Sequence, residues 1–378
     1  MAHSSQSSAR ASLEFSTAEL TGALGDSVTV LPLLVALAAM TSISLPHVLV
    51  GFGAFQIVWG LYYGMPLSVE PMKALVGLAI VGTLSYPELA AAGVLAGVTL
   101  LVVGRLGLVG RLQTVVGEPV VRGVQFAVAL LLLEAALDLS VESLPVAAAG
   151  LAVVAALTLF GYHKQSVLVV LGLGGFAAVA SAGVPTPQLP EAAFFPAGAP
   201  SFSAAALEGT VAQLGMTVGN AAIATALLCE DLYDRDVSAD DLSQSMGVTC
   251  LAAIPFGGVP MCHGSGGLAG KYAFGARTGG ANVLLGVGYL ALALVAAGAV
   301  LAAFPLALLG VLLVVIALEL GRAAFDPVDT HQSLAVVVGV GAVGLLVNVG
   351  VAFVLGTVVF LVLENRKRDA TNATAGRA

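Results

Sequence analysis

The residues whose types and spacing suggest chemistry lie at 64–73, which read Gly-Met-Pro-Leu-Ser-Val-Glu-Pro-Met-Lys. Glu70 and Lys73 are charges within an apolar region, and charged residues inside a membrane are costly and usually functional. Pro71 suits the first position of a helix, so we predict a short helix from Pro71 to near Gly82. Such a helix would be about 18 Å long, whereas the bilayer core measures about 30 Å. We therefore expect a half-helix that begins near the membrane midplane.

The start of this half-helix is a candidate anion site. A helix N-terminus carries partial positive charge and unpaired N–H groups, to which Lys73 adds a full charge. A second stretch at 258–275 repeats the Gly-x-Pro opening, and Pro66 aligns with Pro260 at an offset of 194 residues. Interrupted segments at corresponding places in two halves of a chain indicate a transporter binding site. The alternative is a pair of broken helices that only pack.

Other polar residues in the apolar segments complete the candidate substrate site. Gly264, Gly266 and Gly267 would let the backbone approach a ligand closely. Gln213, Thr217 and Asn220 are spaced to share one helix face. Interhelical hydrogen bonding is the alternative role for Thr217 and Asn220, and His263 could be a capped loop residue, a proton carrier or a ligand contact. The whole predicted site is Asp26, Thr29, Ser68, Glu70, Lys73, Gln213, Thr217, Asn220, Cys262, His263, Gly264, Ser265, Gly266 and Gly267.

The bulk composition is that of a polytopic membrane protein. The chain has 378 residues, a mean hydropathy of +1.02 and only 10% charged residues, which excludes an ordinary soluble globule. The polar, Ser-rich start reads as a tail and shows no signal peptide. The three cysteines have neither a disulfide framework nor metal-ligand spacing. We expect no metal, no cofactor, no nucleic-acid partner and no enzymatic activity, since no nucleophile–base pair is visible.

Apolar runs between turn residues predict an all-α membrane protein of about fourteen transmembrane segments. In the first half the segments are 19–41, 44–63, 70–83, 87–104, 119–138, 144–160 and 166–183. In the second half they are 207–229, 241–256, 263–277, 281–303, 305–321, 331–346 and 347–363. Seven segments per repeat is an odd number, so the second copy must be inverted in the membrane. The expected fold is a 7+7 inverted repeat whose half-helices, segments 3 and 10, point their N-termini at each other.

Basic residues predict the orientation. If the N-terminus is inside, thirteen of the fourteen lysines and arginines, Lys271 among them, face the cytoplasm, and the outside loop 184–206 has none. This is the positive-inside pattern. Lys73 is then the single basic residue away from the cytoplasmic side. We expect a multi-pass protein of the cell membrane with both termini cytoplasmic.

Several stretches resemble the molybdate transporter family, a relative of the sulfate permeases. They are Glu19–Asp26 (Glu-Leu-Thr-Gly-Ala-Leu-Gly-Asp), Pro71–Ala74 (Pro-Met-Lys-Ala), Gly215–Thr225, the glycine-rich run Phe256–Gly270 and its continuation Phe274–Asn282. The resemblance spans nearly the whole chain, and the glycine-rich run is highly specific. One departure is visible: where the family usually has Val-Gln-Pro-Met-Lys, this chain has Glu70 in place of the glutamine.

The resemblance implies a two-domain transporter of elevator type. A core domain of 19–104 and 207–303 would move against a gate domain of 105–183 and 304–363, with 184–206 as an extracellular loop. Residues 1–18 and 364–378 would be cytoplasmic tails. The chain ends 15 residues after Leu363, so we do not expect the cytoplasmic domain that sulfate permeases usually carry. A tetrahedral oxyanion would bind between segments 3 and 10.

The predicted function is therefore secondary active transport of an oxyanion, with molybdate first and sulfate or tungstate as alternatives. We expect proton coupling, with Glu70 as first and Asp26 as second candidate carrier, because protonating Glu70 would remove its repulsion of an incoming dianion. An anion channel and a nucleobase carrier on the same fold are the competing functions. The sequence leaves open whether the chain forms a homodimer.

Overall fold

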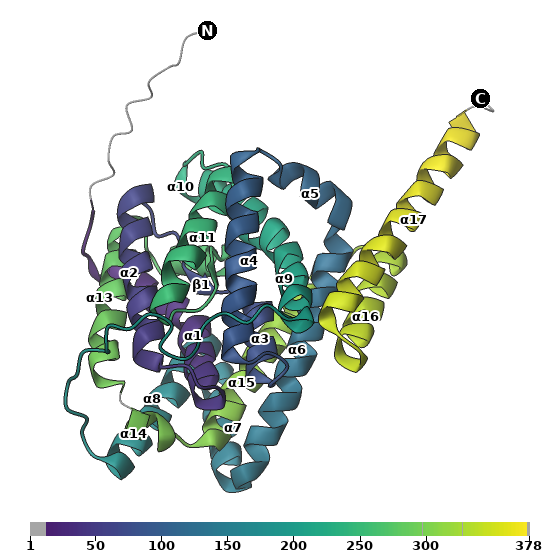
Figure 1. The fold of residues 1–378 in the computed structure, drawn as a ribbon. Helices are drawn as coiled ribbons and strands as arrows, with labels where there is room; N and C mark the ends of the chain where they lie inside the picture. The colour runs from purple at the N-terminus through teal and green to yellow at the C-terminus, as the bar shows by residue number, and fades with distance from the viewer. Residues whose placement is uncertain (1–12, 297, 327, 376–378) are drawn as a thin grey trace, which may run out of the picture.

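The computed structural model describes residues 13–296, 298–326 and 328–375 (Figure 1). The outer ends of both predicted tails, residues 1–12 and 376–378, lie outside the described residues. Helices dominate, as predicted, and each of the fourteen predicted segments overlaps a helix. Within the described residues, eight helical stretches are long and apolar enough to span a membrane, and Gly280–Val295 and His331–Leu346 are shorter apolar helices.

The elements keep the predicted order. The first half contains α1 (Thr17–Met40), α2 (Leu45–Tyr63), β1 (Glu70–Pro71), α3 (Lys73–Ile80), α4 (Tyr86–Arg105), α5 (Val109–Val116), α6 (Glu118–Ser140), η1 (Val141–Ser143), α7 (Leu144–Leu159) and α8 (His163–Ala182). The second half contains α9 (Ala204–Met216), η2 (Thr217–Ile223), α10 (Ala224–Tyr233), α11 (Ala239–Ala253), η3 (Ile254–Phe256), β2 (Met261–Cys262), α12 (Ser265–Ala273), α13 (Gly280–Val295), α14 (Gly298–Ala302), α15 (Leu306–Phe325), α16 (His331–Leu346) and α17 (Val349–Ala375).

The helix packing has the symmetry of an inverted repeat. An inverted repeat relates segment 1 to segment 8, segment 2 to segment 9, and so on. The contact between α2 and α13 (segments 2 and 11) then corresponds to the contact between α11 and α4 (segments 9 and 4), and both pairs pack closely. The contact of α1 with α12 likewise corresponds to that of α9 with α3, and both are present. Small residues allow these close approaches: a Cβ on Gly53 or Gly286 would collide with the opposing helix. The predicted repeat architecture is confirmed.

The half-helix α3 and the strand β1 before it lie in the middle of the molecule (Figure 1). Strands β1 and β2 precede the two half-helices and pair antiparallel, with Glu70 opposite Cys262 and Pro71 opposite Met261. Because Glu70 and Pro71 are held extended in this ladder, α3 begins at Lys73, and the prediction that Pro71 opens the helix is wrong. At eight and nine residues, α3 and α12 are each far too short to cross a bilayer.

Segment 8 departs from a regular α-helix. It runs as α9, then as a π-helical stretch over Thr217–Ile223, then as α10. Such π stretches are rare and occur frequently at functional sites. The short helix α5, which the segment prediction omitted, connects α4 with α6 and presents a strongly amphipathic sequence.

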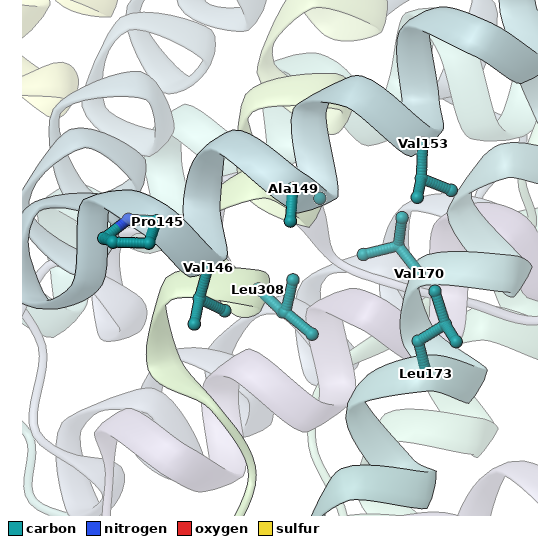
Figure 2. A pocket seen from close by; sticks show the side chains of 8 residues that line it. Pro145, Val146, Ala149, Val153, Val170, Leu173 and Leu308 are labelled. Carbon is teal, nitrogen blue, oxygen red and sulfur yellow. The ribbon is translucent and has the colours of Figure 1, made fainter.

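A hollow of about 300 Å³ lies between α7, α8 and α15 (Figure 2). Its lining is entirely apolar and consists of Pro145, Val146, Ala149, Gly150, Val153, Val170, Leu173 and Leu308. It offers no charge and no hydrogen-bond donor side chain to an anion, so it is not a candidate anion site.

Candidate anion site

Glu70 and Lys73 form an ion pair where the half-helices meet. Lys73 Nζ lies 2.7 Å from Glu70 Oε2, and the Glu70 side chain is only 2% exposed whereas that of Lys73 is 26% exposed. The Lys73 side chain is therefore the more exposed member of this ion pair. The predicted proximity of these two residues to the start of segment 10 is present in the structure.

The N-terminus of α12 supplies backbone donors. The N–H of Gly267 donates to Glu70 Oε1 at 2.9 Å. The N–H groups of Ser265 and Gly266 donate to no other group in the part of the chain that the structure describes, and Gly266 is exposed. Free N–H groups at a helix start, next to a lysine, are an anion-binding arrangement. In this structure the Glu70 carboxylate lies between the Gly267 N–H and the Lys73 ammonium.

The three predicted glycines at the start of α12, Gly264, Gly266 and Gly267, differ in how tightly they are packed. A Cβ on Gly264 would overlap the Glu70 carboxylate, and a Cβ on Gly267 would overlap Glu70 and Asp26. No atom lies within 4 Å of the position that a Cβ on Gly266 would take. Gly264 and Gly267 are therefore held by tight packing around Glu70, whereas the space beside Gly266 is open.

This difference predicts two kinds of glycine variant. Gly264→Val should lower expression and thermal stability, because Glu70 has no room to move away. Gly266→Val should fold as wild type but lose molybdate binding at least about tenfold, because its side chain would project into the space beside the free N–H groups. Fluorescence-detected size exclusion and a binding titration measure the two effects. Wild-type binding by Gly266→Val would place the anion elsewhere.

The N-terminus of α3 is already capped. The N–H groups of Ala74 and Leu75 both donate to Gln213 Oε1, at 2.9 and 3.3 Å, and Gln213 Nε2 donates to Thr217 at 2.9 Å. Gln213 and Thr217 therefore share a face, as predicted, and hold α9 against α3. The amide oxygen and nitrogen of Gln213 are both engaged within the core, whereas at α12 the N–H groups of Ser265 and Gly266 have no partner among the described residues.

Asp26 is paired with a lysine that we expected to be cytoplasmic. Lys271 Nζ lies 3.1 Å from Asp26 Oδ2, and both side chains are 0% exposed. Lys271 also donates to Asn282 Oδ1 at 2.6 Å and to Gln56 Oε1 at 3.1 Å. The prediction that Lys271 faces the cytoplasm is wrong, and so is the expectation that Lys73 is the single basic residue away from that side.

A signal for Lys271 exists in the sequence. A half-helix that starts at Ser265 near the midplane would carry Lys271 only about 9 Å toward the membrane surface, which leaves it inside the bilayer core. Gln56 and Asn282, which the sequence reasoning also missed, are polar residues within apolar segments and carry the same kind of signal as Asp26. Together these side chains join α1, α2, α12 and α13 through one hydrogen-bonded network.

Three other predicted site residues, His263, Cys262 and Thr29, are engaged in contacts within the protein. The His263 ring nitrogens contact Ser68 O at 3.0 Å and Ser245 Oγ at 2.7 Å, which favours the role of a capped, structural histidine. Cys262 is buried in the β-ladder. Thr29 Oγ1 bonds only weakly, at 3.5 Å, to the Asp26 carbonyl of its own helix.

Asn220 does not join the group. Its side chain donates to Gln125 Oε1 on α6 at 3.4 Å. The helix is π-helical over this stretch, so the α-helical spacing rule, which placed Asn220 on the face of Thr217, does not hold there.

The sequence matches the family model described as "Molybdate transporter of MFS superfamily" over residues 18–132 and 205–320. Molybdate transporter 2 of Arabidopsis thaliana is 28% identical over 95% of this chain and 89% of its own length. Molybdate transporter 1 of the same plant is 30% identical over 92% of this chain and 88% of its own length. Molybdate transporter 1 of Chlamydomonas reinhardtii is 26% identical, covering 90% of both.

Solved structures share the fold. The transmembrane domain of the cyanobacterial bicarbonate transporter BicA superposes with a TM-score of 0.63 at 19% identity, covering 89% of this chain and 97% of that one. The murine anion transporter Slc26a9 in its inward-facing state gives 0.66 at 14% identity, covering 93% of this chain and 69% of that one. At such identities the likeness shows the fold, a 7+7 inverted-repeat membrane transporter. With the family match and the named relatives, the chain belongs to the molybdate transporter family, whose members are membrane anion transporters and not enzymes.

Proposed function

We propose that this protein is a secondary active transporter that takes up molybdate, bound at the α12 N-terminus beside Lys73. The observation that carries the proposal is the partly exposed Lys73 side chain, which pairs with Glu70 at the start of α12, where the N–H groups of Ser265 and Gly266 have no partner among the described residues. A tetrahedral oxyanion needs several donors at once, and an anion in a low-dielectric site needs a counter-charge. The relatives named as molybdate transporters favour molybdate over sulfate and tungstate.

Glu70 is the residue through which we propose that proton binding is coupled to oxyanion binding. Its carboxylate takes the Gly267 N–H and the Lys73 ammonium, two donors that an oxyanion would use. A dianion arriving beside an ionised Glu70 meets repulsion. Protonating Glu70 removes that repulsion and releases Lys73, so proton and oxyanion should bind together. Asp26 is the second candidate carrier.

The proposed movement is of elevator type. In the structure α6 packs with α15, α16 and α17, while α1 to α4 pack with α9 and α11 to α13. These contacts support the proposal of a gate domain, 105–183 and 304–363, and a core domain, 19–104 and 207–303, which touch each other through α3 with α6 and α9 with α17. The candidate site residues lie in the core, apart from the contact of Asn220 with α6. We propose that the core carries the anion across the gate, in a cell membrane with both termini cytoplasmic.

A parallel binding titration of the purified protein with molybdate, sulfate and uracil tests the substrate class. Tight molybdate binding with no uracil binding is the expected result, since a flat nucleobase would not use Lys73 and backbone N–H groups in this way. Uracil binding without molybdate binding would favour the nucleobase carrier. Non-saturating molybdate current in a planar bilayer would favour the channel.

Proton coupling predicts gradient-driven uptake. Molybdate should accumulate in vesicles when the outside is made acidic, and Glu70→Gln should lose this dependence while still binding molybdate, because the amide cannot exchange a proton. The measurement is uptake of labelled molybdate with and without an imposed pH gradient. Wild-type uptake that ignores the gradient would exclude proton coupling, and a gradient-driven Glu70→Gln variant would move the carrier to Asp26.

A further inference from the structure

Three oxygen atoms from different parts of the core face one point beside α12. A Cβ built on Gly267 would meet Glu70 Oε1, Asp26 Oδ1 and Ser68 Oγ before any other atom. The three side chains are at most 2% exposed. Glycine at 267 is therefore required not only for the helix start but also for bringing the two carboxyl groups close to each other.

Two of these three oxygens have no partner. Asp26 Oδ1 and Ser68 Oγ make no hydrogen bond in the part of the chain that the structure describes. The outer oxygens are held firmly instead, Asp26 Oδ2 by Lys271 and Gln56, and Glu70 Oε2 by Lys73. A buried polar atom without a partner costs about 1–3 kcal/mol. Because Glu70 Oε1 accepts from the Gly267 N–H, Asp26 Oδ1 is the inner carboxylate oxygen that lacks a hydrogen.

We propose that Asp26 and Glu70 act as one carboxyl pair that takes up a single proton between their inner oxygens, with the Ser68 hydroxyl bridging them. This inference rests on the proposed function, and it replaces a single carrier by a pair. Neighbouring carboxylates disfavour double ionisation, and two coupled acids titrate as a unit and not as separate residues. The proton comes from bulk water on one side of the membrane and returns to bulk water on the other.

The charge of the site explains why the carboxyl pair would take up a proton when the anion binds. Asp26, Glu70, Lys73 and Lys271 sum to zero, so a dianion alone would leave two uncompensated negative charges in a buried site. One proton on the carboxyl pair halves that excess, and uncompensated buried charge is expensive.

The other titratable groups facing the pair are already engaged. His263 uses both ring nitrogens, the Tyr289 hydroxyl bonds to Ser27, and the Cys262 thiol faces the carbonyl of Pro71. The carboxyl pair is therefore the place in this core where an added proton satisfies oxygens that have no partner.

The test combines calorimetry with infrared spectroscopy on the full-length protein at neutral pH. Molybdate titrations in two buffers of different ionisation enthalpy should show uptake of about one proton per anion. Molybdate-induced difference spectra should show one new carboxylic-acid carbonyl band. We expect proton uptake and band to disappear both in Glu70→Gln and in Asp26→Asn/Lys271→Met, which removes the second carboxylate together with its lysine.

Two serine variants keep the test decisive if the double variant does not fold. Ser68→Ala leaves both ion pairs intact and should shift the carbonyl band, since it removes the bridging hydroxyl. Ser27→Ala, a buried serine bonded to Tyr289, is the matched control and should leave the band unchanged. A band that persists unshifted in Ser68→Ala, or one that the double variant retains, overturns the shared pair. Molybdate binding without proton uptake overturns this inference and the proposed proton coupling but leaves molybdate transport standing, whereas no binding at all overturns the proposed transport as well.

Discussion

Lys73→Met should abolish molybdate binding while the protein still folds. The lysine is partly exposed and forms its ion pair with Glu70. Its loss therefore leaves the buried hydrogen bonds of Lys271 with Asp26, Gln56 and Asn282 intact. Removing a charged partner from a largely desolvated anion site costs about 3 kcal/mol, which corresponds to roughly a hundredfold weaker binding. Titration calorimetry measures the affinity, and thermal unfolding in the absence of molybdate measures the fold.

The control for this variant is Lys164→Met. Lys164 lies near the start of α8 and contacts the ring of Phe274, away from the Glu70 carboxylate. The substitution Lys164→Met removes the same charge from the chain as Lys73→Met and should leave the affinity for molybdate unchanged. If Lys73→Met binds molybdate normally, Lys73 is neither ligand nor counter-ion. If it unfolds at a much lower temperature than Glu70→Gln/Lys73→Met, the main role of Lys73 is to neutralise Glu70.

Much of the fold could be predicted because its causes are local or repeated along the chain. Apolar runs separated by turn residues located the helices, and the paired Gly-x-Pro openings located both half-helices. The start of α3 was misplaced because it depends on a partner distant in the sequence. Pro71 is a good first helical residue in isolation, but pairing with Met261 keeps it extended.

The site was less predictable for the same reason. Counting basic residues assigns Lys271 to the cytoplasm, since the rule treats each lysine by its position in the sequence and not by its neighbours. Only the packing of α12 against α1 and α13 shows that Asp26 and Asn282 surround it. Gln213 looked like a ligand contact, and it proved to cap α3 because its amide reaches two backbone N–H groups of another segment.

Lys271→Met should destabilise the protein far more than Lys73→Met does. The Lys271 ammonium is completely buried and bonds to Asp26, Gln56 and Asn282. Removing one partner of a buried ion pair leaves an uncompensated charge and costs about 3–5 kcal/mol. Thermal unfolding of the detergent-purified protein should therefore show a drop of several degrees or a failure to express, whereas Lys73→Met should show a smaller drop, because the Lys73 side chain is partly exposed and Glu70 keeps the Gly267 N–H.

The double variant Asp26→Asn/Lys271→Met separates charge burial from simple loss of packing. Neutralising both members of a buried pair is often tolerated, because neither charge then needs a partner. We expect it to recover most of the stability that Lys271→Met loses. A double variant as unstable as Lys271→Met would assign the loss to packing and to the bonds with Gln56 and Asn282. If Lys271→Met itself unfolds at the wild-type temperature, the lysine is not buried, and the cytoplasmic position predicted from the sequence would be restored.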